Sequence, residues 1–138
     1  MPYRALLGCY DGYRRATCGS AVNFLVSAEV MGYECFGGSG ASDGNGMRVT
    51  DRFDLSEMPS STGSSWSGYY AGIYRCNELI TRENSIQWNE TGSMHTQYMA
   101  ECHAIRAFLY FDVVRQFGNI PLLTKPTDEN IPQADPAD

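Results

Sequence analysis

Basic residues are scarce in this chain. Its 138 residues include 10 Lys and Arg against 16 Asp and Glu, for a formal net charge of −6 and an isoelectric point near 4.8. Nucleic-acid binding needs clustered positive charge to neutralise phosphates, so this composition argues against a nucleic-acid partner. No apolar run is long enough to span a membrane. Residues 1–9 hold only a short apolar stretch, which does not predict a signal peptide.

The sequence also lacks the motifs of nucleotide, metal and hydrolase sites. The glycine-rich run 37–46 has neither a Gly-Lys-Ser/Thr nor a G-x-G-x-x-G in register, so it does not predict phosphate binding. No Cys/His cluster has zinc spacing, and residues 43–46 lack the full calcium-loop pattern. No Gly-x-Ser-x-Gly elbow is present. We therefore expect no cofactor, no metal site and no catalysis.

The five cysteines do not form a recognisable disulfide framework, because their number is odd and no Cys-x-x-Cys pair occurs. Cys9, Cys76 and Cys102 lie in apolar helical stretches, where free cysteine behaves as a small buried hydrophobe. The alternative, in an oxidising compartment, is a bridge between Cys9 and Cys18 or between Cys18 and Cys35.

Amphipathic helices are what the chain does contain. Apolar residues at helical spacing predict helices over residues 2–15, 20–31, 65–81 and 93–117. The last ends at Gly118, which suits a left-handed cap. It is apolar on most faces and needs burial between layers. We therefore expect an all-α fold of TPR-like helical hairpins, with residues 1–138 forming the N-terminal portion of a longer chain.

A long segment, residues 32–64, separates the second and third predicted helices. Its glycines and serines predict irregular structure, and the stretch 47–55 favours a short strand. Loops of this length are usually functional or disordered, and the interleaved aromatic and acidic residues favour an ordered, functional loop. Tyr33, Phe36 and Phe53 are its candidates for stacking on a ligand. The aromatics of the following helix, Trp66, Tyr69 and Tyr70, have helical spacing and are predicted to be core.

Three segments carry a family resemblance. The first runs from Glu34 to Gly38, with Asp43 downstream. The second, residues 66–80, has a Trp, an aromatic residue, an Ile and an Asn at fixed spacing, and the third is the helix and Gly-x-x-Pro-Leu turn of residues 100–122. In order and spacing these segments resemble the SusD/RagB family of outer-membrane glycan-binding lipoproteins from Bacteroidetes.

The resemblance implies an all-α, TPR-like fold and a non-catalytic role. Such a protein binds an oligosaccharide at the cell surface and passes it to a TonB-dependent SusC-like transporter. It is a surface-exposed lipoprotein of the outer membrane, held there only by an N-terminal lipid anchor that residues 1–138 do not contain. Glycan sites in the family use loop aromatics and polar groups, which points here to Tyr33, Glu34, Phe36, Asp43 and Asn45. Tyr33 departs from the family, in which an Asp is frequent at this place.

Two other functions stay open from the residues themselves. Paired amphipathic helices also suit a TPR-like protein-interaction module that binds no sugar. An enzyme would need a pair of loop carboxylates for glycoside hydrolysis, and Glu34 with Asp43 is the pair available in the loop.

Overall fold

A computed structural model describes residues 2–18, 24–38, 40, 42, 45–54, 56, 58–88 and 92–127. Its elements are α1 (Pro2–Cys18), α2 (Phe24–Met31), α3 (Asn45–Asp51), α4 (Met58–Thr81), the 3-10 turn η1 (Glu83–Ser85) and α5 (Gly92–Phe117). No strand occurs among these residues, which confirms the predicted all-α class. Helix α1 extends three residues beyond the predicted end, and α5 begins one residue before the predicted start. The expected first residues of the second helix, 20–23, lie outside the described part of the chain.

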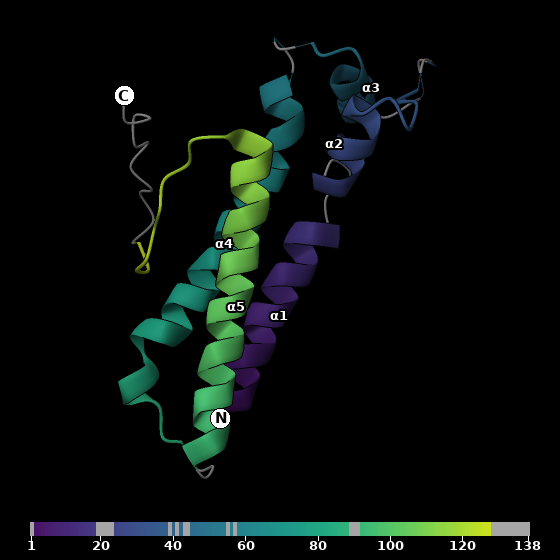
Figure 1. The fold of residues 1–138 in the computed structure, drawn as a ribbon. Coiled ribbons are helices and arrows are strands. Elements are labelled where there is room, and N and C mark those ends of the chain that lie inside the picture. Colours follow the sequence, from purple (N-terminus) through teal and green to yellow (C-terminus); the bar gives the residue numbers. More distant parts are fainter. Residues whose placement is uncertain are drawn as a thin grey trace.

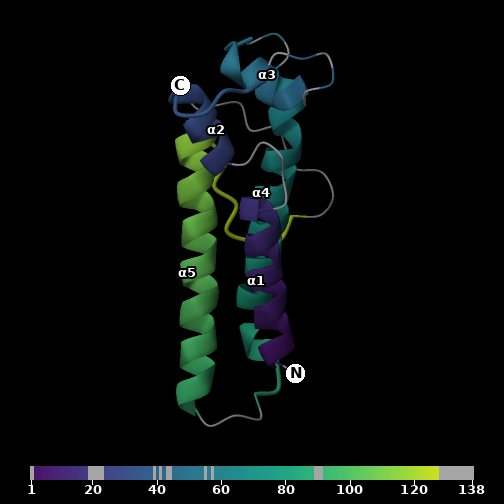
Figure 2. The same cartoon turned by 90° about the vertical axis from the view of Figure 1, so that its right-hand side faces the viewer.

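Helices α1, α4 and α5 lie side by side in an elongated bundle, with α2 and α3 at one end (Figures 1 and 2). Each of the three presents one stripe of buried residues to a shared core. The buried positions repeat at helical spacing, as one face of a helix requires, and in α4 the stripe is wide enough to include adjacent pairs. They include Leu6, Cys9, Gly12 and Ala16 in α1, Tyr69, Tyr70, Ile73, Cys76, Asn77 and Leu79 in α4, and Tyr98, Cys102, Ile105, Leu109 and Val113 in α5.

The expectation of irregular structure over residues 32–64 is wrong in two places. Residues 45–51 form helix α3 although a short strand was expected within 47–55, and α4 begins at Met58, seven residues before the predicted start at 65. Val49 and Thr50 are neighbours yet are both buried, a pattern that a half-buried strand does not give. Helix α3 packs against α4, and this contact outweighs the weak helix propensity of Gly46, Val49 and Thr50 in α3 and of the serines at the start of α4.

The chain leaves α5 at a left-handed cap. Gly118 has φ +77°, and its N–H donates to the Val114 carbonyl at 2.9 Å, as the sequence predicted. Residues 118–127, which we call the strap, then turn back alongside α4 and α5 (Figure 1). The Tyr70 hydroxyl donates to the Pro121 carbonyl at 2.8 Å. These bonds fix the direction in which the chain leaves the bundle.

The outer faces of α1 and α5 retain exposed apolar side chains. On α5, Phe108, Phe111 and Val114 are 59%, 55% and 45% exposed. On α1, Tyr3 and Leu7 are also exposed. None of the described helices combines the length and apolarity needed to cross a membrane.

All five cysteines are free thiols, and Cys9, Cys76 and Cys102 are buried as predicted. Both alternative bridges, Cys9–Cys18 and Cys18–Cys35, are therefore wrong. Helix geometry also excludes the bridge between Cys9 and Cys18, because both lie in helix α1. Nine residues of helix separate their Cα atoms by about 13 Å along the axis, roughly twice the span of a disulfide.

Candidate functional site

Helix α2 ends in a Schellman cap with an aromatic residue in the left-handed position. The N–H of Glu34 donates to the Glu29 carbonyl at 3.0 Å, and the N–H of Tyr33 donates to the Val30 carbonyl at 3.3 Å. These are the six-to-one and five-to-two bonds of the motif. Tyr33 occupies the position that glycine usually takes, with φ 64°.

Helix α3 ends in the same way. The N–H of Asp54 donates to the Val49 carbonyl at 3.1 Å, and the N–H of Phe53 donates to the Thr50 carbonyl at 3.2 Å. Phe53 takes the left-handed position with φ 51°. For a residue with a Cβ atom this conformation costs about 1–2 kcal/mol, so each cap holds strain that a glycine would relieve.

The two strained caps place their rings together. The ring centroids of Tyr33 and Phe53 lie 6.4 Å apart at an interplanar angle of 39°. The two side chains are 83% and 42% exposed, and Phe36, three residues after Tyr33, is 74% exposed. We call the paired rings of Tyr33 and Phe53 the aromatic platform. Strained backbone and exposed large aromatics are both costly in a fold, and where they coincide they point to a functional surface.

The structure divides the predicted site residues into three groups. Tyr33, Glu34 and Phe36 are exposed on the segment that follows α2, and Phe53, in the turn that follows α3, lies beside Tyr33. Asn45 is the first residue of helix α3, so its expected place in an irregular loop is wrong. Asp43 lies outside the described residues.

A hollow lies between α4 and the strap, with a volume of about 650 Å³. Its walls include Trp66, Tyr70, Tyr74, Asn77 and Lys125. The sequence predicted the first two as core and gave no signal for Tyr74 or Lys125, because only the path of the strap brings the lysine against α4. The ring centroids of Trp66 and Tyr70 lie 4.7 Å apart, and this packing supports the predicted structural role of Trp66.

The family-like residues around this hollow hold the strap in place. The side-chain amide of Asn77 donates to the Leu123 carbonyl at 2.8 Å and accepts a hydrogen bond from Arg106 at 2.7 Å. The Tyr110 hydroxyl donates to the Leu123 carbonyl at 2.7 Å and accepts from the Leu123 N–H at 2.8 Å. The second and third resembling segments thus build structure, and the aromatic platform is the better candidate for a ligand site.

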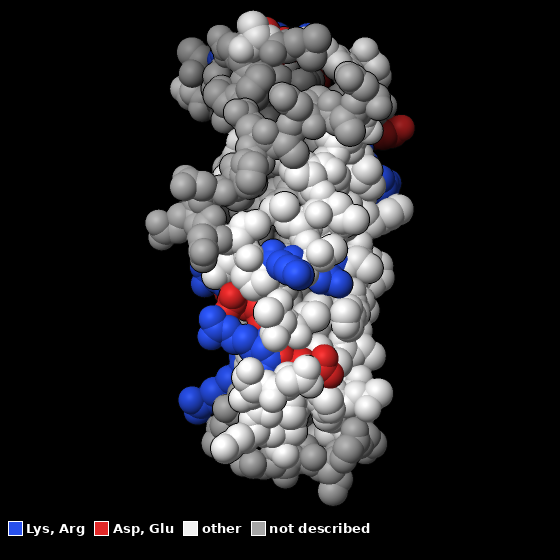
Figure 3. All heavy atoms as spheres, turned by 90° about the vertical axis from the view of Figure 1, so that its left-hand side faces the viewer, with Lys and Arg blue, Asp and Glu red and all other residues white. Residues whose placement is uncertain are grey.

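Charge on the described surface is mixed in sign. On the face drawn in Figure 3, basic and acidic side chains lie next to one another, with no expanse of one sign among the coloured residues. Arg75 and Arg14 donate hydrogen bonds to Asp11 and lower the pKa of that carboxyl from 3.8 to about 2. Such local pairing suits a neutral ligand better than a polyanion.

Comparison with known proteins identifies the family. Residues 42–135 match a family named SusD-like and described as starch-binding and associating with the outer membrane. A 72-residue stretch is 36% identical to SusD-like protein P38 of Formosa agariphila, and this match covers 52% of the present chain and 13% of that relative. No solved structure matches the chain. Because the family match spans more than half of its residues, the chain belongs to the SusD-like family.

Proposed function

We propose that this chain binds glycan at the bacterial cell surface, without cleaving it, and takes part in its delivery to a TonB-dependent SusC-like transporter. Membership of a family described as starch-binding and associating with the outer membrane supports the ligand class and the location. The observation that carries the proposal is the pair of exposed rings, Tyr33 and Phe53, at two left-handed helix caps. We further propose that the protein reaches the outer membrane as a surface-exposed lipoprotein.

An aromatic platform suits a sugar because the C–H face of a pyranose is apolar and stacks on a ring. Covering about 80 Å² of apolar surface on Tyr33 or Phe53 is worth roughly 2 kcal/mol, or about 30-fold in the dissociation constant. Polar neighbours then fix the orientation of the sugar. We assign this role to Glu34, which is exposed beside Tyr33, and to Asp43 and Asn45.

Electrophoresis through gels that contain a dissolved polysaccharide tests the proposal. Soluble starch is the first probe, followed by a panel of other neutral glycans, with a plain gel as reference. We expect starch or another glycan of the panel to retard the chain, and Tyr33→Gly and Phe53→Gly each to abolish most of the retardation. Tyr3→Gly is the matched control, because Tyr3 is 52% exposed on α1 at the other end of the bundle.

Glycine makes this test sharper than alanine does. It keeps the left-handed cap and relieves its strain, so Tyr33→Gly and Phe53→Gly are expected to be more stable than the parent by about 0.5–1 kcal/mol while losing the ligand. Loss of binding through unfolding is then distinguishable. Equal retardation of the parent and both variants contradicts the platform, and new reducing ends released from the glycan contradict the non-catalytic role.

A TPR-like protein-interaction module is the second candidate, and the exposed stripe on α5 favours it. Phe108 and Phe111 are more than half exposed, and apolar patches of this kind often mark protein interfaces. This reading predicts that Phe108→Asp abolishes cross-linking to one defined outer-membrane protein, whereas Tyr33→Gly leaves the cross-link intact. If Phe108→Asp keeps the cross-link, and Tyr33→Gly but not Phe108→Asp loses its retardation by the polysaccharide, the glycan site is favoured.

A further inference from the structure

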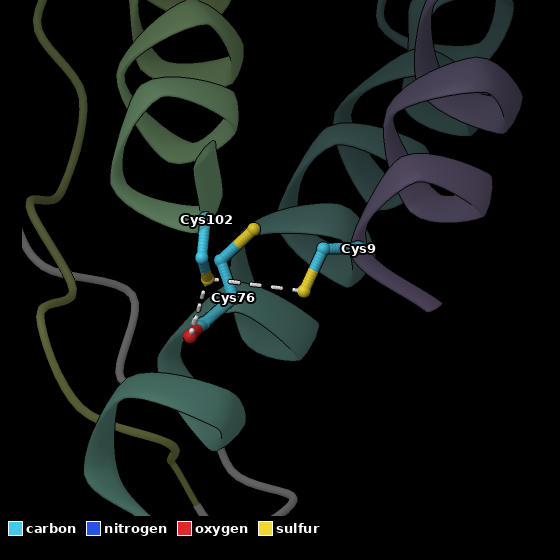
Figure 4. Close-up of side chains that lie close together, drawn as sticks. All are labelled: Cys9, Cys76 and Cys102. Atoms are coloured by element: carbon cyan, nitrogen blue, oxygen red, sulfur yellow. Dashed lines mark hydrogen bonds between the residues drawn. The ribbon is translucent and has the colours of Figure 1, made fainter. Parts of the chain in front are cut away.

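Three buried thiols meet where α1, α4 and α5 pack together. Cys9, Cys76 and Cys102 come from these three helices in turn, and all are 0% exposed. Their Sγ atoms lie within 4.8 Å of one another. Figure 4 shows the three sulfurs gathered between the helices, with the Cys102 Sγ also 3.6 Å from the Cys76 carbonyl oxygen.

The spacing of these sulfurs suits one ion at their centre. The Sγ atoms of Cys9 and Cys102 are 3.9 Å apart. A metal bound in a plane to three thiolates at about 2.3 Å separates the sulfurs by about 4.0 Å, so the largest spacing present needs to close by only about 0.8 Å. Side-chain rotation can supply such a change without moving a helix.

The ligand set selects the class of metal. Among the described residues, the group contains three thiols and no carboxylate or imidazole. Complete burial leaves no route for a water ligand, whereas zinc takes four ligands in proteins. Soft, all-sulfur surroundings favour Cu(I) and other thiophilic ions of closed d-shell that accept three ligands.

We propose that Cys9, Cys76 and Cys102 form a trigonal all-thiolate site for a soft monovalent metal ion of the Cu(I) class. Binding is an exchange without redox change: three sulfur–metal bonds form, and the thiol protons that leave pass to solvent. Because the site is closed, the ion enters while the bundle is open. Refolding in the presence of the ion should load it faster than addition to the folded chain.

The experiment uses the full chain with the two exposed thiols removed. Cys18→Ser with Cys35→Ser is the background, because both residues are exposed and would bind metal on their own. This variant is refolded without oxygen beside a Cu(I)-loaded chelator, separated from it, and analysed for copper per chain. X-ray absorption then counts the sulfur neighbours of the copper, and thermal melts compare loaded and unloaded protein.

We expect one Cu(I) per chain, three sulfur neighbours, and a higher melting temperature when the ion is bound. Changes outside the ligand shell alone cost roughly 10–100-fold in metal affinity, so Cys9→Ala, Cys76→Ala and Cys102→Ala should each lose at least ~100-fold. If a core variant fails to fold, the stoichiometry and sulfur count of the background variant still decide. Absence of copper, two-coordinate copper unaffected by Cys76→Ala, or a chain purified in air with Cys9 and Cys102 joined as a disulfide would overturn the proposal.

Discussion

Asn77 connects both long helices to the strap, and its replacement by alanine tests how the chain end is held. The side chain is 1% exposed. Its amide nitrogen lies 2.8 Å from the Leu123 carbonyl oxygen and 3.3 Å from that of Lys125. Its oxygen accepts a hydrogen bond from Arg106 at 2.7 Å. Asn77→Ala removes all of these contacts at once.

The loss can be estimated bond by bond. A neutral amide–carbonyl bond contributes about 1 kcal/mol, and a bond from a charged donor about 1.5–3 kcal/mol. The contact with Lys125 is long and adds little, and the Leu123 carbonyl keeps the Tyr110 hydroxyl as a partner. We therefore expect Asn77→Ala to lower the free energy of unfolding by about 3 kcal/mol.

The loss of stability in Asn77→Ala is measured by urea unfolding at 25 °C, monitored by circular dichroism and by tryptophan fluorescence. Trp66 lies in the wall beside the strap, so fluorescence also reports local release. Gln97→Ala is the matched control, because this exposed amide makes one hydrogen bond, to Glu101 at 2.9 Å. It should cost less than about 0.5 kcal/mol. The comparison requires that the slope of unfolding free energy against urea concentration is the same in the parent and the variants.

Asn77→Asp separates the two sides of the network. A carboxylate still accepts from Arg106 but cannot donate to the Leu123 carbonyl. If the strap bonds matter, this variant loses stability too. The reasoning is refuted if the stability lost in Asn77→Ala is within about 0.5 kcal/mol of that lost in the control Gln97→Ala. It is also refuted if Asn77→Asp keeps the full stability of the parent.

Three further predictions follow from helix packing and charge. Gly12→Ala should cost about 1–3 kcal/mol, because its Cβ would lie 3.0 Å from the Cα of a glycine on α4. The added methyl group in Gly8→Ala meets nothing within 4 Å, so this variant should gain about 0.5–1 kcal/mol of stability. Thermal melts in which Gly12→Ala raises the melting temperature and Gly8→Ala lowers it would contradict this. Leu109→Ala should cost about 2–5 kcal/mol because Leu109 is 0% exposed, whereas Phe108→Ala should cost below about 0.5 kcal/mol in urea. The pKa of Asp11 is lowered from 3.8 to about 2 in the folded state, so the ionised carboxylate stabilises the fold at pH values above 3.8. This contribution is lost as the pH falls toward 2. Asp11→Asn should therefore flatten the acid limb of stability against pH, and an unchanged limb contradicts the pairing.

Local pattern was enough to place most of the helices. The spacing of apolar residues predicted α1, most of α4 and α5, because a helix that packs on one side has apolar residues with a 3.6-residue period. Gly118 at the end of α5 was predicted for the same kind of local reason, since glycine suits the left-handed cap there.

Segments with weak periodicity were not predictable in this way. Helix α3 has no regular apolar period and the first turns of α4 are rich in serine, so contact between the two helices decides their conformation. The platform is a related case. Loop aromatics were expected to be exposed, but the pairing of Tyr33 with Phe53 depends on two helix caps that face each other.

The sequence by itself determined the all-α class, the stripes that face the core and the family of the chain, because each depends on residue types at short, fixed spacing. Tertiary structure alone decided which stripes meet. Cys9 and Cys102 are 93 positions apart, yet their sulfurs lie 3.9 Å from each other. Asn77 reaches the Leu123 carbonyl across 46 positions. A periodic pattern tells which face of a helix is buried, but only packing tells which distant side chain it is buried against.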